Sequence, residues 1–405
     1  MGASCDNIDS DGLGFGGPGS GGVSVTTGCY PLGEIISSRP VTFEDIGGDR
    51  RLAPRTVRVV EVADPFVSRW SVRDRERYDN LEAAADDLAR ARRVAGLWQR
   101  KPGSAYSDQH GTVAAKTDSQ WGDPVASSYY FDQIASESFD AWKAVIPSAR
   151  ALLYLADPWA HEHVQDPGGE AVPVDDAAQV AWSLSLDAVA IRSRAAVMAD
   201  LLAERSKLES TSGRDLRWLS VACGTALPAF QAAVASRVAP DMWLVDIDRD
   251  ALSLAAELAG RVGFNGRLST KRTNIFRPDS MGALRAELAD SGGLADMIDM
   301  MGIFEYTGDN LGVDPVGFLK SVWDCLAPGG FLVTGQMRAD RPRSDFTTGV
   351  IGWPYIQLRT PDELMAIIQT AGIHPENVEL HLPTDGVYMI AGITKPHQSS
   401  RDTRR

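Results

Sequence analysis

The sequence predicts an α/β protein whose helices surround a mainly parallel sheet. Two short apolar runs, residues 218–221 and 243–246, lead to this prediction, because each is followed by turn residues and then by a segment suited to a helix. Such runs are typical of parallel strands that are buried on both faces. A chain of 405 residues can bury a large core, and its length favours two or three domains.

The turn after the first run consists of five small residues, Ala222–Ala226, so a ligand pressed against its backbone would meet few side chains. The second run ends in Asp246, roughly 20 residues later, the spacing at which a carboxylate binds ribose hydroxyls in strand–helix–strand nucleotide sites. A dinucleotide site would need three glycines for the pyrophosphate, and only Gly224 is present. We therefore expect a nucleoside-binding site of another kind.

The segment Leu219–Ala226 resembles the first motif of class I S-adenosylmethionine (SAM)-dependent methyltransferases. That family usually places an acidic residue after the strand, followed by Gly-x-Gly-x-Gly. Here Ser220 replaces the acid, and only the middle glycine is kept. The resemblance implies SAM as the cofactor, bound by Ser220, Ala222, Cys223, Gly224, Thr225, Asp246, Ile247, Asn274, Ile275 and Gly302.

The resemblance also implies a role for several of these residues. Asp246 would bind the ribose hydroxyls, Ile247 would pack on the adenine, and the backbone of residues 222–225 would approach the methionine part. Residues 268–276 are expected to form a third strand, and Asn274 near its end would meet the adenine edge, since its amide can both donate and accept.

A fourth motif follows at residues 294–306, with Asp296 at the start of a strand. By resemblance, residues 302–306 line the methyl-transfer end of the site. Glu305 and Tyr306 are the candidate catalytic residues for orienting or deprotonating the substrate. For Glu305, a charge favoured at a helix N-terminus is an equally good explanation.

The later segments favour the same family. A helix is expected over residues 318–326, then the turn Pro328-Gly329-Gly330, a strand over 331–334, a capped helix over 360–372 and a hairpin from strands 378–381 and 387–393. The predicted fold is therefore α/β, a seven-stranded Rossmann-like methyltransferase sheet with a closing antiparallel hairpin, plus a mainly helical N-terminal region.

Composition divides the chain into four expected parts. Residues 1–38 form a flexible Gly/Ser-rich arm, 39–178 a mainly helical cap or substrate-recognition region with an acidic linker, 179–396 the SAM-binding methyltransferase domain, and 397–405 a polar tail. Within the cap region we expect a strand over 56–63 and a helix over 73–99. One long helix is expected over 176–207.

The cap region also contains an aromatic-rich segment, residues 121–142. Part of it loosely resembles the cap motif of ubiquinone/menaquinone-type methyltransferases, which folds over the cofactor. We take Tyr129, Tyr130 and Phe304 as candidate substrate contacts. A purely structural helix core is the more probable role of the aromatic residues in 121–142.

Charge and cysteine content restrict the partners. The net charge of −14 disfavours nucleic acid, since phosphate binding needs a basic face. The four cysteines have no metal-ligand spacing, so we expect no metal site, and they suit a reducing cytoplasm. No apolar run approaches 18 residues, so no membrane partner is expected. A small-molecule substrate is expected, while its identity and the oligomeric state stay open.

Three rival functions remain on the sequence alone. A non-methylating SAM enzyme could transfer the aminocarboxypropyl group or cyclise the cofactor, releasing methylthioadenosine. An NAD-dependent oxidoreductase would share the strand–helix–strand core. A binding protein could keep the fold without catalysis.

Overall fold

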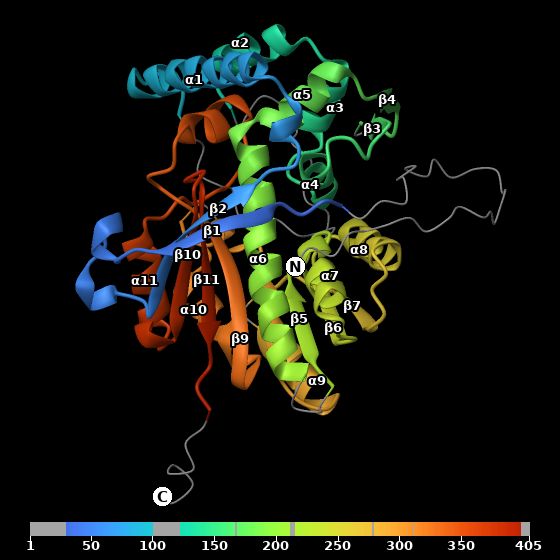
Figure 1. Cartoon of the computed structure of the whole chain (residues 1–405), viewed down its shortest axis with the longest axis vertical. Coiled ribbons are helices and arrows are strands. Elements are labelled where there is room, and N and C mark those ends of the chain that lie inside the picture. Colours follow the sequence, from blue (N-terminus) through green and yellow to red (C-terminus); the bar gives the residue numbers. More distant parts are fainter. Residues whose placement is uncertain are drawn as a thin grey trace, which may run out of the picture.

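A nine-stranded sheet forms the centre of the molecule (Figure 1). The computed structural model describes residues 30–99, 122–166, 168–210, 215–277, 279–309 and 311–397. The strands of the sheet are β1 (Glu34–Pro40), β2 (Thr56–Ala63), β5 (Arg217–Val221), β6 (Asp241–Asp246), β7 (Arg267–Arg272), β8 (Ala295–Met300), β9 (Leu326–Met337), β10 (Val378–Pro383) and β11 (Tyr388–Thr394).

The strand order is β1-β2-β10-β11-β9-β8-β5-β6-β7. Strands β7, β6, β5, β8 and β9 are parallel neighbours, and β11 is antiparallel to both β9 and β10. These seven strands form the Rossmann-like sheet with the closing antiparallel hairpin that we predicted, so the fold prediction is confirmed.

The sheet has two more strands than predicted. Residues 56–63 form a strand as expected, but this strand, β2, pairs in parallel with β10, and β1 pairs with β2. Without them β10 would be an edge strand with unpaired backbone groups. Residues 34–38, which we assigned to the flexible arm, lie in β1. Residues 1–29 of that arm and residues 398–405 of the polar tail lie outside the described residues.

Helices cover both faces of the sheet. The helices are α1 (Val72–Val94), α2 (Pro124–Ile134), α3 (Glu137–Ala144), α4 (Ala149–Ala156), α5 (Asp176–Leu184), α6 (Leu186–Ser210), α7 (Leu227–Ser236), α8 (Arg249–Arg261), α9 (Ser280–Asp290), α10 (Pro315–Asp324) and α11 (Pro361–Thr370). One core cluster contains side chains of α6, α7 and α8, and another those of α9, α10 and α11. Burial of both faces explains the continuous apolar runs in the parallel strands.

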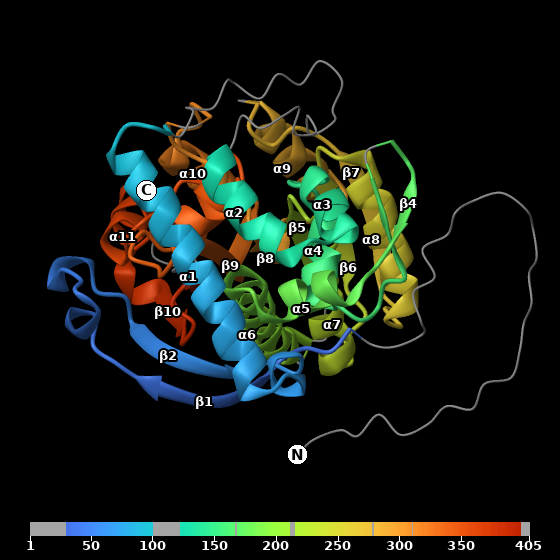
Figure 2. The ribbon, with the colours of Figure 1, turned by 90° about the horizontal axis from the view of Figure 1, so that it is seen from above.

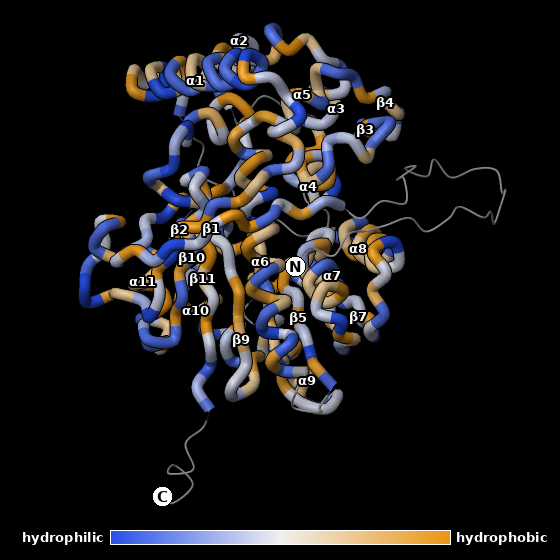
Figure 3. The backbone as a smooth tube through the Cα atoms, viewed as in Figure 1, coloured by the Kyte–Doolittle hydropathy of each residue, from blue (hydrophilic) through white to orange (hydrophobic). Residues whose placement is uncertain are grey.

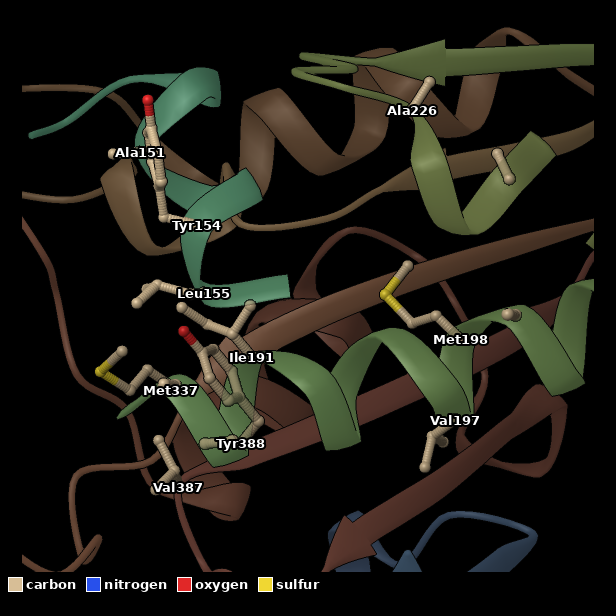
Figure 4. Close-up of a cluster of buried hydrophobic side chains, with 14 of the residues drawn as sticks. Ala151, Tyr154, Leu155, Ile191, Val197, Met198, Ala226, Met337, Val387 and Tyr388 are labelled. Carbon is tan, nitrogen blue, oxygen red and sulfur yellow. The ribbon is translucent and has the colours of Figure 1, made fainter. Parts of the chain in front are cut away.

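Helices α1 to α5 form a cap beyond one end of the sheet, as Figure 2 shows from above. The cap and the sheet share a core cluster in which Leu155 of α4, Ile191 of α6 and Tyr388 of β11 lie near one another (Figure 4). Long hydrophilic stretches mark α1 on the outside of the cap (Figure 3). None of the described helices is long and apolar enough to cross a membrane.

The helix expected over residues 176–207 is two helices. Ser185 between them is extended, with φ −60° and ψ 138°. The backbone N–H of Leu186 opens the second helix and donates to both carboxylate oxygens of Glu82 on α1, each at 3.3 Å. A buried carboxylate from a distant helix therefore caps α6, which sequence periodicity cannot indicate.

Other boundaries differ by a few residues. Helix α1 ends at Val94 and β7 ends at Arg272, so Asn274 lies in the loop after the strand. Strand β9 begins at Leu326 and continues through the Pro-Gly-Gly turn as a bulge, because Ala295 pairs with Leu326 while Met297 pairs with Phe331. The capping box at Thr360 is present as predicted.

The Glu82 contacts predict a stability effect. At pH 8 the Glu82 carboxyl is ionised, because burial raises its pKa only to about 7, and it binds the Arg343 guanidinium at 2.7 Å. Glu82→Ala removes both this ion pair and the cap of α6, so we expect the free energy of unfolding to fall by about 3 kcal/mol in urea denaturation. Asp87→Ala on the same helix breaks only an exposed pair with Arg90 and should cost about 0.5 kcal/mol. Equal losses in the two variants would contradict the capping role.

Candidate functional site

A cavity of about 270 Å³ lies at the carboxyl ends of the parallel strands. It is located where the strand order reverses, between β5 and β8, which is the usual ligand position in open α/β sheets. Its walls come from the loops after β5, β6, β7 and β8, from α3 and α4 of the cap, and from the start of α6. The cavity therefore lies between the sheet and the cap.

The small-residue loop after β5 forms one wall of this cavity. Ala222, Gly224 and Ala226 all have left-handed backbone, with φ of 48°, 51° and 50°. Such a conformation is costly for alanine and persists only when neighbouring contacts hold it. Here the N–H of Cys223 donates to Val245 O at 3.0 Å, and that of Gly224 donates to Asp246 Oδ2 at 2.8 Å.

Asp246 at the end of β6 joins this loop to the next one. Its Oδ2 accepts from Gly224 N and its Oδ1 accepts from Asp248 N at 2.9 Å. Burial raises the pKa of the carboxyl, and the bonds from Asp248 and Gly224 oppose this by favouring the charged form. Each oxygen keeps a lone pair, so the carboxylate can still accept from two ligand hydroxyls.

The purine-side candidates lie beside Asp246. Ile247, Asn274 and Ile275 all line the cavity, as expected. The side-chain oxygen of Asn274 accepts from Phe276 N at 3.0 Å. Its amide nitrogen is therefore the group available as a donor to a ring nitrogen of a ligand.

Ser220 does not face the cavity. It is fully buried in β5 and donates its hydroxyl to Asp299 Oδ1 on the neighbouring strand β8, at 2.8 Å. The indole N–H of Trp218 donates to Asp299 Oδ2 at 2.7 Å. Asp299 itself lines the cavity, so a carboxylate lies beside Ser220, the position at which the resembled family has an acidic residue.

Asp299 is a residue that the sequence reasoning missed. Asp296 was chosen in this strand, but its Oδ2 accepts from Arg217 N at 3.0 Å and it is absent from the cavity lining. Ser220 and Asp299 are paired in the β5–β8 register, so a carboxylate across from a lost acid was a usable signal. Burial raises the pKa of Asp299 to about 6, although the bonds from Trp218 and Ser220 lower it.

Glu305 and Tyr306 lie at the other end of the cavity, in a 3-10 turn (Phe304–Tyr306) after β8. Both carboxylate oxygens of Glu305 are buried and have no hydrogen-bond partner among the described residues. Burial raises the pKa of this carboxyl, and the Arg194 guanidinium, with Nη1 3.8 Å from Oε1, lowers it. The hydroxyl of Tyr306 accepts from Trp353 Nε1 at 2.7 Å.

Hydrogen bonds from Arg359 hold the turn that carries Glu305. The Arg359 guanidinium donates to Phe304 O at 3.1 Å, to Thr307 O at 2.5 Å and to the side-chain oxygen of Gln336 at 2.6 Å. The carbonyl of Glu305 also accepts from Gln357 N at 2.7 Å. These bonds fix the backbone of the turn, and Glu305 belongs to the cavity lining.

The three predicted substrate contacts lie outside the cavity lining. Phe304 packs in the core on the α10 and α11 face, opposite to Glu305. Tyr130 packs edge-to-face on Phe346 in the core, with ring centroids 4.8 Å apart, and Tyr129 is exposed on α2. Two other aromatic residues of the predicted segment, Phe139 and Trp142, do line the cavity. Trp121 lies outside the described residues.

The remaining cavity residues come from parts of the chain that carried no motif. Arg194, Met337, Phe346, Trp353 and Tyr388 line it together with Gly302. The first five lie, in that order, on α6, β9, a π-helical turn (Phe346–Val350), the loop after it and β11. Gly302, which was predicted to bind the cofactor, lies in the loop after β8. Within the described ranges, no group of three histidine, cysteine or acidic side chains is placed to hold a metal ion.

Comparison with known proteins finds similar solved structures, all at low sequence identity. No protein-family profile and no curated protein matches the sequence. Among solved structures, an O-methyltransferase family protein from Burkholderia thailandensis is similar with a TM-score of 0.37 and 16% identity over 53% of this chain. The match covers 60% of the Burkholderia protein.

Two further structures are similar at the same level. A protein from Bordetella parapertussis has a TM-score of 0.48 and 17% identity over 78% of this chain and 96% of its own. An N,N-8-amino-8-demethyl-D-riboflavin dimethyltransferase from Streptomyces davawensis has a TM-score of 0.34 and 16% identity over 52% of this chain and 58% of its own. At these values the function has to be argued from the site itself.

The site predicts how the Asp299 carboxyl titrates. Ser220→Ala removes one of the two hydrogen bonds that favour the charged form, so the pKa should rise from about 6 by about one unit. Carbon-detected NMR on aspartate-labelled protein measures it directly. Ser236→Ala is the control, because that hydroxyl binds only carbonyls of its own helix. An unchanged pKa in Ser220→Ala would refute the hydrogen-bond assignment.

Proposed function

We propose that this protein binds SAM and transfers its methyl group to a small-molecule acceptor. The observation that carries the proposal is the convergence on one cavity of the small-residue loop, Asp246, Asn274 and Asp299. Each comes from the end of a different parallel strand or from the loop after it. Together they provide hydrogen-bonding groups suited to a ribose, a purine edge and an ammonium group.

The residues at this end fit SAM in detail. Asp246 would accept from the two ribose hydroxyls, and the amide nitrogen of Asn274 would donate to the adenine ring, between Ile247 and Ile275. The loop 222–226 presents backbone and small side chains to the methionine part. Asp299 would bind the methionine ammonium group, replacing the acid that the family has at the position of Ser220.

When bound, SAM supplies a methyl group already activated by its sulfonium charge. The protein then has to orient the acceptor, remove its proton and exclude water. Glu305 is suited to take the proton, because its buried carboxylate has no hydrogen-bond donor among the described residues and its pKa is raised by burial. Tyr306 is held by Trp353 and would position the acceptor.

A small-molecule acceptor is favoured by the shape of the site. The cavity of about 270 Å³ is bounded on one side by the sheet and on the other by α3, α4 and the start of α6, a size that suits a small molecule. The net charge of −14 also disfavours nucleic acid. Free Cys223 and Cys325 suit the cytoplasm as the compartment.

One observation keeps a second SAM chemistry open. The carboxylate at the methionine end comes from β8 instead of β5, so the methionine part would be held differently from the usual family arrangement. Transfer of the aminocarboxypropyl group, or cyclisation, releases methylthioadenosine, whereas methyl transfer releases S-adenosylhomocysteine. Mass spectrometry of the nucleoside product after incubation with candidate acceptors separates the two reactions.

The proposed function predicts which nucleosides the protein binds. We expect calorimetric titration to show binding of SAM and S-adenosylhomocysteine but not of NADH. Asp246→Ala should weaken SAM binding by about 100-fold or more, since two charge-assisted hydrogen bonds to the ribose are lost.

Asp250→Ala is the matched control for this experiment, because Asp250 is an exposed carboxylate on the following helix. It should bind SAM like the unaltered protein. Urea denaturation of both variants separates a binding defect from unfolding. Unchanged SAM affinity in Asp246→Ala would remove the ribose assignment, and no nucleoside binding by the unaltered protein would leave a non-catalytic protein with this fold.

The second prediction concerns pH. Burial raises the pKa of Asp299 to about 6, so below that pH the group is protonated and cannot pair with the ammonium. The dissociation constant for SAM should rise up to about tenfold per pH unit below 6 and level off above it. In Asp299→Asn the affinity should be low and independent of pH between 5 and 7. A parallel pH profile in that variant would exclude Asp299 as the ammonium partner.

A further inference from the structure

One buried arginine differs from the others in its surroundings. The described residues contain four buried arginines, Arg192, Arg194, Arg341 and Arg359. Arg192 donates to Asp64 Oδ2 and to three backbone carbonyls at 2.7–2.8 Å. Arg359 likewise binds carbonyls and Gln336, and Arg341 is ion-paired with Asp187 at 2.6 Å. The guanidinium groups of Arg192 and Arg359 are satisfied by hydrogen bonds, and that of Arg341 is held by its close ion pair.

Arg194 has no such partners. It lies on the same helix as Arg192 and is buried to nearly the same extent. However, it forms no hydrogen bond to any described residue, and its Nε is buried without a partner. Its nearest carboxylate, Glu305, is 3.8 Å away, which exceeds the 2.7–2.9 Å of a charge-assisted hydrogen bond. A buried cation left in this state is costly, so an acceptor from outside the protein is the natural partner.

The position of Arg194 is nevertheless well defined. Its guanidinium lies 4.4 Å from the centroid of the Tyr388 ring, a cation–π contact. Gly302 and Gly335 border it, since a Cβ on Gly302 would lie 3.4 Å from Nη1 and one on Gly335 would lie 3.4 Å from Cδ, which is van der Waals contact. The side chain lines the cavity at the end that carries Glu305, away from Asp246.

The walls around this end are mainly aromatic and apolar. Phe346, Trp353, Ile356, Met337 and Tyr388 line the cavity with Arg194. Apolar walls favour a flat apolar body, and they also strengthen a charge–charge contact by excluding water. Among the described residues, Arg194 is the one cationic side chain in the lining, whereas four carboxylates, Asp246, Asp248, Asp299 and Glu305, belong to it besides the ion-paired Asp187.

We propose that the methyl acceptor is an aromatic molecule carrying a carboxylate, and that Arg194 binds this carboxylate. This inference rests on the proposed function and deepens it by naming the substrate class. The planar guanidinium matches a carboxylate with two parallel hydrogen bonds. Arg194 would thereby fix which atom of the acceptor faces the cofactor end.

The test uses the full chain and two simple probes, 4-hydroxybenzoate and its neutral amide, 4-hydroxybenzamide. Binding of each is measured by ligand-observed NMR with and without saturating S-adenosylhomocysteine. We expect the carboxylate to bind at least about tenfold more tightly than the amide, because only the carboxylate forms the charge-assisted pair. Equal binding of the two probes would overturn the proposal.

Two variants locate the effect. Arg194→Met keeps much of the side-chain volume and should weaken 4-hydroxybenzoate by about 10- to 100-fold while changing 4-hydroxybenzamide by less than about threefold. Arg194→Lys keeps the charge and should restore part of the preference. If Arg194→Met weakens both probes equally, Arg194 serves only to hold Glu305, and the proposal fails. Urea denaturation of both variants confirms that they are folded.

The experiment distinguishes failure of the proposed function from failure of the carboxylate assignment. S-adenosylhomocysteine binding with no carboxylate preference would leave the proposed function standing and remove this inference. A carboxylate preference that disappears in Arg194→Met, without nucleoside binding by the unaltered protein, would retain the anion site and remove SAM-dependent transfer.

Discussion

The bonds that Asp246 accepts from Gly224 and Asp248 hold the ends of two adjacent strands in one arrangement. A buried carboxylate has to be hydrogen-bonded, and here the backbone amides of two loops meet that need. The same bonds hold the loop after β5 in its left-handed conformation, which alanine at 222 and 226 would not adopt by preference. The candidate cofactor end of the cavity therefore depends on one side chain for both its shape and its charge.

A second buried carboxylate, Asp299 on β8, is also held by hydrogen bonds from a neighbouring segment. Trp218 and Ser220 donate to it from β5, so donors on one strand hold an acid on the next. Burial of this carboxyl at the cavity raises its pKa to about 6. A degenerate first motif is thus compatible with a site that still offers a carboxylate to a cationic ligand.

The cap determines the other end of the cavity. The break at Ser185 separates α5 from α6, and Glu82 on α1 caps the new helix. Helix α6 then carries Asp187 and Arg194 into the cavity, next to the turn that carries Glu305. The contrast between Arg192, whose hydrogen bonds are satisfied, and Arg194, whose bonds are not, separates a structural arginine from a candidate binding residue on the same helix.

The sequence by itself determined the parallel strands, the closing hairpin and the loop residues near Asp246, since these follow from local periodicity, turn residues and fixed spacing. It could not determine the partner of Ser220, the two strands added beside β10, the break at Ser185 or the position of Arg194. Each of these depends on contacts between segments far apart in the chain, such as Glu82 with Leu186 and Arg194 with Glu305. The same limit explains Phe304, Tyr129 and Tyr130. The sequence indicates an aromatic residue, but only tertiary packing decides whether it faces the core, the solvent or the cavity.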